Sequence, residues 1–433
     1  MNLKSQLESS LPIDHQHLLH FVADVAGGLG YPVYMVGGSV RDLMLGRAVN
    51  DFDLTVEGDA GTLAELMLRR LGGKIMTHPK FGTARWTPTD STFERLNVPV
   101  LQPEKIPPFL DFVSTRSETY SKSGALPKVK KSGITDDLRR RDFTINAMAL
   151  RLDGFHFGEL FDIVDGRSDL ERGLIRVLHP NSFIDDPTRL LRAVRYAERY
   201  GFEIESETLK LFNDHAKSIL KNLSGERLRH EIDLIFDEAN RVTMFKRSKE
   251  LGLLQNIHPA LQNADHERLI LVKDKPREGF GEIPVPDMLA FTQALGWVLC
   301  LMDISEKEIE KIAKRLAFPA SLTKAARAAA SLYGGVSSFK DWKPSRWTFY
   351  LEELPPLAIY AVWLTTSVNP LRKYLENWQY VKSFTTGDDL KNQGLEPGPK
   401  YKEILNRLRA AWLDEEVRSE QEEINLRNRL IAE

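Results

Sequence analysis

Hydrophobic and polar residues follow different patterns in the first 165 residues and in the rest of the chain. In the first part, short runs with strand composition alternate with segments whose apolar residues recur every three or four positions, as on one face of a helix. The sequence therefore predicts an α/β region there. Its expected elements are a strand at 31–36, a helix at 39–46, a strand at 50–56, a helix at 61–73, and strands at 82–87 and 110–116.

From residue 165 onward the helical pattern continues almost without interruption. The segments at 186–202, 207–223 and 226–239 each carry apolar residues three or four positions apart. In the first part, a proline-bearing stretch at 98–108 is expected to form an inserted surface loop. Because 433 residues exceed what a single core normally holds, we expect several domains and an α+β fold with an all-α remainder.

The composition restricts the class of protein. The chain has 59 Lys and Arg against 61 Asp and Glu, so any surface that binds a polyanion must be local. We find neither a run of about 18 apolar residues nor the start of a secretory signal, so we expect a cytoplasmic protein without a membrane span. The one cysteine, Cys300, lies in an apolar run, which excludes a disulfide framework and predicts a core position.

A glycine pair joins the first expected strand to the helix that follows it. Gly37 and Gly38 allow a backbone to approach a triphosphate closely at the positive end of the helix, and Arg41 is placed to neutralise its charge. Taken alone, a glycine pair is more often an ordinary tight turn. Its combination with the acidic strand downstream predicts a nucleotide site.

That acidic strand carries Asp51 and Asp53, which are two residues apart and so share one face of the strand. Two neighbouring carboxylates repel each other unless a cation such as Mg²⁺ lies between them. Two such ions would activate a 3′ hydroxyl group and stabilise a leaving pyrophosphate. Asp111 would supply a third carboxylate if its strand lies beside this one, although a solvent-facing role is an equal alternative.

Two further groups of residues suit contacts with a nucleotide. In the first, Arg141 has the forked donors that phosphate accepts, and Asp142 and Asn146 are able to hold a ribose hydroxyl. The alternative for this group is a helix start with a capping Asp and a solvated basic turn. From these residues alone, the two interpretations are about equally probable.

The second group begins with Asp186 before a proline, a strong signal for the start of a helix. Arg189, Arg192 and Arg195 follow in steps of three, so they share a slowly drifting face with Asp186. An Asp and Arg pair is able to read the edge of a base without a nucleic-acid template. Taken alone, these residues are more often an N-cap and a solvated basic face.

Together these segments resemble the class II tRNA nucleotidyltransferase and bacterial poly(A) polymerase family over about residues 31–240. GGSVRD with DFD is similar to the family's metal and triphosphate motif, RRDFTINAMA to its ribose motif, and SGERLRHE to its neck motif. DDPTRLLRAVRYAERYGF is similar to its nucleotide-selecting helix, although the family more often has Glu where this chain has Asp185. The segment 116–137 is similar to its flexible loop, which enzymes that add only CC have shortened.

The resemblance implies a polymerase-β-like nucleotidyltransferase head at 1–165, including the loop at 116–137. A helical neck with the nucleotide-selecting helix would follow at 166–240, and a helical body and tail at 241–433 would bind the tRNA acceptor arm. The implied activity is template-independent addition of C, C and A to the 3′ end of tRNA from CTP and ATP with two Mg²⁺ ions. The expected site residues are Asp51 and Asp53 for the metal, with Asp111 beside them, and Gly37, Gly38, Arg41, Arg141, Asp142, Asn146, Asp186, Arg189, Arg192 and Arg195 for the nucleotide.

Three alternatives stay open. An A-adding enzyme or poly(A) polymerase would use the same chemistry, because base selection depends on the geometry of the selecting helix rather than on the motifs. A non-catalytic RNA-binding protein would normally have lost a metal carboxylate, and both are present here. A nucleotidyltransferase acting on small molecules would not need the long helical remainder.

Overall fold

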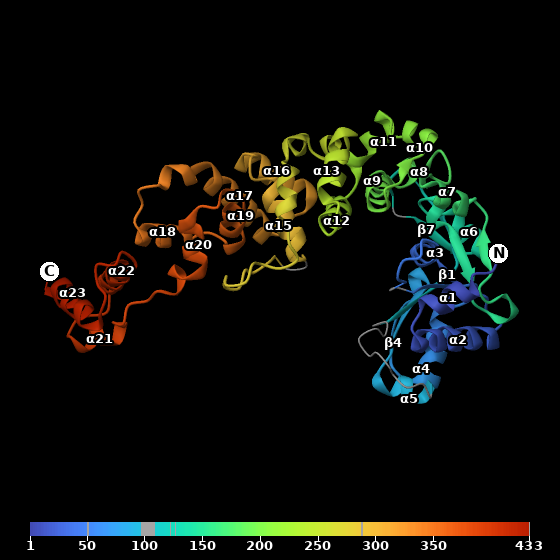
Figure 1. The fold of residues 1–433 in the computed structure, drawn as a ribbon, viewed down its shortest axis with the longest axis horizontal. Coiled ribbons are helices and arrows are strands. Elements are labelled where there is room, and N and C mark those ends of the chain that lie inside the picture. Colours follow the sequence, from blue (N-terminus) through green and yellow to red (C-terminus); the bar gives the residue numbers. More distant parts are fainter. Residues whose placement is uncertain (50–51, 97–108, 122, 126, 287–288, 433) are drawn as a thin grey trace. The chain divides into compact units, whose positions relative to one another are not determined.

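The structure is a computed structural model that describes residues 1–433 except 50–51, 97–108, 122, 126, 287–288 and 433. Its chain divides into two compact units, Met1–Leu223 and Ser224–Glu433 (Figure 1). In the described residues all strands belong to the first unit, and the second is helical. This confirms the predicted α+β fold with a helical remainder. The finer division at residues 165 and 240 stays a prediction, and the insertion at 98–108 lies outside the described residues.

A seven-stranded mixed sheet forms the centre of the first unit, in the order β3-β4-β5-β2-β1-β8-β9. Only β2 and β5 run parallel to each other, and the other neighbours are antiparallel. The strands are β1 (Val33–Val36), β2 (Asp53–Val56), β3 (Lys74–His78), β4 (Thr83–Thr87), β5 (Leu110–Ser114), β8 (Met148–Arg151) and β9 (Leu160–Asp162).

The first unit also contains the helices named below, and two further strands form a separate hairpin. The helices are α1 (Lys4–Ser10), α2 (Ile13–Gly28), α3 (Gly38–Met44), α4 (Ala60–Leu71), α5 (Asp90–Leu96), α6 (Ile134–Arg139), α7 (Gly166–Arg172), α8 (Ser182–Asp185), α9 (Thr188–Tyr200), α10 (Ser206–Lys210) and α11 (Asp214–Ile219). The hairpin strands are β6 (Arg116–Thr119) and β7 (Lys128–Lys131), within the segment that resembles a flexible loop. Two short parallel strands, β10 (Leu174–Ile175) and β11 (Glu203–Ile204), lie in the region expected to be helical.

The sequence pattern determines which face of the sheet is buried. Helix α4 packs against β3, β4 and β5, where Trp86 and Phe112 are fully buried. Residues that alternate with them, such as Arg85 and Asp111, are much more exposed because they lie on the opposite face. On β2 the predicted alternation is confirmed for Leu54, which is buried, whereas Asp53 is exposed. One face of these strands is therefore core and the other is open to polar chemistry.

The second unit is built from helices packed around large apolar side chains. Trp297 lies edge-on to Phe236 with ring centroids 5.1 Å apart, and Phe236 stacks on Phe245. Cys300 is fully buried in this core, as predicted. The helices are α12 (Gly225–Phe236), α13 (Arg241–Glu250), α14 (Leu253–Ile257), α15 (Phe291–Cys300), α16 (Glu306–Leu316), α17 (Ala320–Gly335), α18 (Pro344–Leu351), α19 (Pro356–Thr366), α20 (Asn369–Glu376), α21 (Gly387–Asn392), α22 (Pro399–Leu413) and α23 (Glu420–Ala432).

Across the described part of the chain, every helix is too short or too polar to span a lipid bilayer.

Candidate functional site

The turn between β1 and α3 depends on the glycine at its first position. Gly37 has φ +67° and ψ −123°, a conformation that residues with a side chain rarely adopt. Its amide donates a hydrogen bond to the Met148 carbonyl oxygen at 3.1 Å. A Cβ atom built on Gly37 would lie 2.6 Å from Nη1 of Arg141, so the missing side chain leaves the space that this guanidinium group occupies. The glycine turn and Arg141 therefore form one local site.

Arg41 on α3 is nearly buried and is held by two partners. Its Nε and Nη2 atoms donate to the Asp42 carboxylate at 3.0 and 2.9 Å, and its Nη1 atom donates to Oδ1 of Asn146 at 2.5 Å. Asn146 in turn donates to Oδ1 of Asp142 at 3.0 Å. Arg41 thus belongs to a hydrogen-bond network that also contains two predicted nucleotide contacts.

The same network continues to helix α9 through a buried ion pair. Asp142 is only 7% exposed, and Arg192 donates to its Oδ2 atom through Nε at 2.9 Å and Nη2 at 2.5 Å. Burial raises the pKa of the Asp142 carboxyl, but the charge of Arg192 and the hydrogen bonds from Asn146 and Arg192 outweigh burial and hold the pKa below its ordinary value. Asp142 is therefore a carboxylate that ties the ribose motif to α9.

Two tyrosines of α9 complete this network, and neither was predicted from the sequence as a site residue. The Tyr200 hydroxyl group donates to Oδ1 of Asp42 at 3.3 Å, and the Tyr200 ring lies 4.7 Å from the guanidinium carbon of Arg41. The second tyrosine is Tyr196, four residues earlier, so the two rings lie on the same side of the helix. That spacing, directly after the predicted arginines, was the signal available in the sequence. The Tyr196 ring has the guanidinium carbons of Arg41, Arg192, Arg195 and Arg199 at 5.4, 5.8, 5.2 and 5.7 Å.

The two residues predicted to read a base lie at the start of α9. Oδ1 of Asp186 accepts hydrogen bonds from the Thr188 amide at 3.1 Å and the Thr188 hydroxyl at 2.7 Å, which is the capping role considered as its alternative. Arg189 is nearly buried, and its Nη1 atom donates to Oγ of Ser182 at 2.7 Å. Its Nη2 atom donates to the carbonyl oxygen of Arg140 at 2.8 Å. The guanidinium group of Arg189 is therefore held in one orientation.

A cavity of about 390 Å³ opens beside Arg189. Strand β6, helix α6, helix α8 and the start of α9 contribute its walls, so residues of the segment 116–137 lie in the same cavity as Arg189. The lining residues are Ser117, Glu118, Thr119, Tyr120, Asp136, Arg139, Arg140, His179, Asp185 and Arg189.

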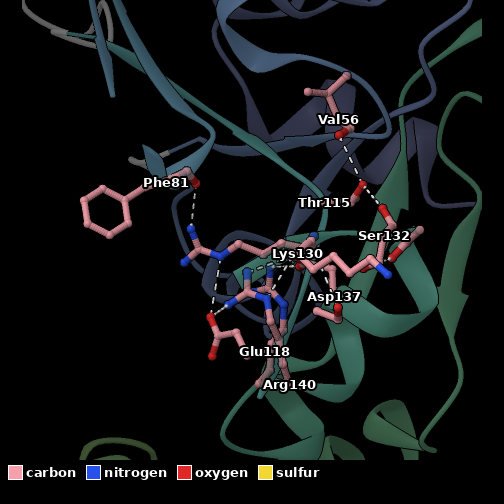
Figure 2. Close-up of polar contacts among 12 residues, drawn as sticks. Val56, Phe81, Thr115, Glu118, Lys130, Ser132, Asp137 and Arg140 are labelled. Atoms are coloured by element: carbon pink, nitrogen blue, oxygen red, sulfur yellow. Dashed lines mark hydrogen bonds and ion pairs between the residues drawn. The ribbon is translucent and has the colours of Figure 1, made fainter. Parts of the chain in front are cut away.

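Charged side chains, two of which line this cavity, connect the end of α6 to the hairpin (Figure 2). The Arg140 guanidinium group donates to Glu118 on β6 at 2.9 Å and to Asp137 at 2.7 Å. Asp137 also accepts from Nη2 of Arg141 at 3.0 Å. Since the carbonyl oxygen of Arg140 also accepts from Arg189, Arg140 links the hairpin to α9, and Asp137 joins it to Arg141 beside the glycine turn. Glu118, Asp137 and Arg140 were not predicted as site residues, because their pairing depends on contacts between separate elements.

The predicted carboxylates lie on neighbouring strands of the sheet. Asp53 on β2 is in register with Asp111 on β5, which satisfies the condition set for a third carboxylate. Both oxygens of Asp111, however, accept hydrogen bonds from Arg85 on β4, at 2.7 and 2.8 Å. Asp51 lies outside the described residues. The catalytic roles of Asp51, Asp53 and Asp111 therefore stay predictions.

The start of β2 offers one exposed carboxylate to a divalent cation, that of Asp53. Exposed carboxylates are the ligands that Mg²⁺ prefers, and Asp53 meets that requirement. No group of three or more His, Cys, Asp or Glu side chains arranged to hold a metal ion occurs in the described portion of the chain. Asp51, two residues before Asp53, is the natural second ligand in the sequence.

Comparisons with known proteins agree with this arrangement of elements. Residues 33–176 match the poly A polymerase head domain, and residues 201–265 match the probable RNA and SrmB-binding site of polymerase A. An A-adding tRNA nucleotidyltransferase of Geobacter sulfurreducens is 34% identical over 97% of this chain and 47% of its own length. A protein of the same name from Halalkalibacterium halodurans is 33% identical over 93% of this chain and 90% of its own length.

Solved structures show the same fold along the chain. A CCA-adding enzyme in its apo form II has a TM-score of 0.80 and 27% identity, covering 98% of both chains. The Thermotoga maritima CCA-adding enzyme complexed with tRNA has a TM-score of 0.74 and 26% identity, covering 100% of this chain and 98% of the other.

Proposed function

Because the chain belongs to the tRNA nucleotidyltransferase and poly(A) polymerase family, we propose that it adds AMP from ATP to the 3′ end of tRNA. The observation that carries this proposal is the 33% identity with the A-adding enzyme of Halalkalibacterium halodurans, which extends over 93% of this chain and 90% of that protein. The chain spans 47% of the Geobacter relative, so the proposal rests on the part that the two share.

The site residues have distinct roles in this proposal. The Gly37 turn and the guanidinium group of Arg141 bind the triphosphate, because open backbone and forked donors suit phosphate oxygens. Asp142 and Asn146 orient the ribose, and Arg192 keeps Asp142 ionised. Asp51 and Asp53 would hold Mg²⁺, which when bound activates the 3′ hydroxyl group and stabilises the departing pyrophosphate.

Complete CCA addition, the activity expected from the sequence, is the second candidate. It is favoured by the 98% coverage of a CCA-adding enzyme at a TM-score of 0.80. The two candidates differ in whether the pocket beside Arg189 also accepts cytosine.

One experiment separates the two candidates. Purified protein with Mg²⁺ is incubated with tRNA transcripts that end before CCA, after C and after CC, with CTP and ATP supplied singly and together. Extension of only the CC-ending transcript, and only with ATP, supports A addition. Complete CCA on the shortest transcript supports the second candidate, and no extension of any transcript contradicts both.

Replacement of Gly37 by Ala should weaken ATP binding. The new Cβ atom would displace Arg141, and the positive φ angle would add strain of about 1–2 kcal/mol. The matched control is Gly46→Ala, which has the same φ of +67° but nothing within 4 Å of its Cβ position. Equilibrium binding should show a loss of ATP affinity only for Gly37→Ala. Urea unfolding should show a larger loss of stability for Gly37→Ala than for Gly46→Ala, because only the Gly37 Cβ atom would meet a side chain.

Replacement of Asp186 by Asn should change the preference for ATP over CTP by about 10- to 100-fold, since one base-reading pair contributes about 1–3 kcal/mol of discrimination. Asn still accepts the hydrogen bonds that cap α9. Thr188→Ala serves as the control, because it removes one of those capping bonds and leaves Asp186 in place. An unchanged ratio of kcat/KM values for the two nucleotides in Asp186→Asn would limit Asp186 to capping.

A further inference from the structure

On the open face of the sheet, one row of side chains crosses three adjacent strands. The strand pairing places Arg85 on β4 opposite Asp111 on β5, and Asp111 opposite Asp53 on β2. Neighbouring strands are about 4.8 Å apart, so the backbone of Arg85 lies roughly 10 Å from that of Asp53. A cation is therefore aligned with the predicted catalytic carboxylates at a distance that one nucleotide is able to bridge.

The Arg85 side chain is held in place and still open to solvent. Its Nε and Nη2 atoms donate to the two oxygens of Asp111, and its guanidinium carbon lies 3.7 Å from the centre of the Phe109 ring. The side chain is nevertheless 46% exposed. Within the described residues, its Nη1 atom makes no hydrogen bond. A planar group fixed on two sides thus presents free donors, which suits one phosphate oxygen.

The order of the strands indicates which phosphate Arg85 is placed to contact. β2 lies between β1, which leads into the Gly37 turn, and β5, which pairs with β4. The triphosphate features therefore lie on one side of Asp53 and Arg85 lies on the other. In nucleotidyl transfer the attacking and leaving oxygens are roughly in line, so the acceptor and the pyrophosphate must occupy opposite sides of the reacting phosphorus.

We propose that Arg85, held by Asp111 and Phe109, binds the 3′-terminal phosphodiester of the acceptor RNA and so positions the hydroxyl group that is extended. The charge of the surface agrees with this occupant, since Lys74 at the start of β3 is also exposed. Asp111 then acts through Arg85 as a positioning residue. The inference rests on the proposed function for the identity of the acceptor.

The test compares two acceptors and four proteins. One CC-ending tRNA carries an ordinary last phosphodiester and the other a neutral methylphosphonate at that linkage. The proteins are the wild type, Arg85→Gln, Arg85→Lys and the control Arg167→Gln. Arg167 is 44% exposed and pairs with Glu171 at 2.7 Å, so it matches Arg85 in exposure and ion pairing.

We expect Arg85→Gln to weaken binding of the ordinary acceptor about tenfold, the size of one charge-assisted hydrogen bond. The slope of log affinity against log salt should fall in magnitude by about 0.7, the value for one phosphate of a single strand. Arg85→Gln and the wild type should bind the methylphosphonate acceptor with equal affinity. Arg85→Lys should recover the salt slope because it keeps the charge, and Arg167→Gln should behave as the wild type.

Two results would overturn the inference. The first is an equal loss of affinity for both acceptors. The second is a changed affinity for Mn²⁺, measured by electron paramagnetic resonance without RNA, which would mean that Arg85 acts on a metal through Asp111. If the wild type extends no tRNA, the proposed function fails instead, and the comparison of the two acceptors still decides whether Arg85 contacts that phosphate.

Discussion

Replacement of Asp53 by Asn should slow nucleotide addition by roughly a thousandfold, because a bound metal ion contributes several kcal/mol to the transition state and each 1.36 kcal/mol is a factor of ten. Asp53 is exposed at the start of β2, next to the buried Leu54, so its side chain contributes little to the core. The loss should therefore appear in single-turnover rates of AMP addition to CC-ending tRNA, with the unfolding midpoint unchanged.

The matched control is Asp24→Asn, which removes an exposed carboxylate from α2, away from the glycine turn and the carboxylate row. Its rate should equal that of the wild type. If Asp53→Asn retained the wild-type rate, Asp53 would not be a metal ligand. If both variants lost activity to the same extent, a general effect of net charge would explain the loss.

Replacement of Arg192 by Met should destabilise the protein by about 3 kcal/mol at pH 7. Removing one partner of a buried ion pair costs about 3–5 kcal/mol, and the lower end applies because the Arg192 side chain is 33% exposed and partly screened by solvent. Asp142 would remain a buried carboxylate that still accepts hydrogen bonds from Asn146 and the Phe143 amide but has lost its charged donor. Urea unfolding of the full chain measures the difference, with Arg172→Met on α7 as an exposed control.

The pH dependence of this difference provides a second measurement. In the wild type the pKa of Asp142 in the folded state is depressed below its unfolded value of about 3.9. The stabilisation is therefore fully present above about pH 4 and is lost as the pH falls through the folded pKa. Without Arg192 the pKa of Asp142 in the folded state is higher than in the wild type, because burial is less opposed. The deficit of Arg192→Met should therefore shrink as the pH falls from that higher pKa to the depressed pKa of the wild type. A deficit that stayed constant with pH would indicate lost packing rather than a lost ion pair.

These predictions concern one connected network. Arg41 on α3, Asn146 and Asp142 of the ribose motif, and Arg192 on α9 are joined by consecutive hydrogen bonds. A second connection runs through Arg140, whose carbonyl oxygen holds Arg189 and whose side chain pairs with Glu118 on the hairpin. Nucleotide binding and base selection are therefore expected to depend on the same few charged contacts.

Several features could be predicted from the sequence because they depend on neighbouring residues. Strand alternation placed Leu54 in the core, and Gly46, which has a positive φ angle, follows the end of α3. The glycine pair indicated the turn before α3, and Asp186 before proline indicated the start of α9. Each of these depends on backbone geometry over a few residues, which local sequence determines.

Other features could not be predicted because they depend on residues far apart in the sequence. From the sequence, the arginines of α9 form either a solvated basic face or a set of nucleotide contacts, with Arg189 reading a base. In the structure Arg189 and Arg195 are nearly buried, and Arg192 pairs with Asp142, fifty positions earlier. For Asp111 the sequence left two interpretations open, a third carboxylate beside the metal and a solvent-facing strand residue, and it gave no sign that the strand order places Arg85 directly beside it.

The sequence by itself determined the α+β fold class, the local turns and helix starts, and the order of the motifs, since hydrophobic periodicity, glycine and proline act within a few residues. Only the tertiary structure decided which charges are paired. A carboxylate and a guanidinium group form a strong pair only when the fold brings them within hydrogen-bond distance and excludes water, and that depends on strand order and helix packing rather than on spacing along the chain.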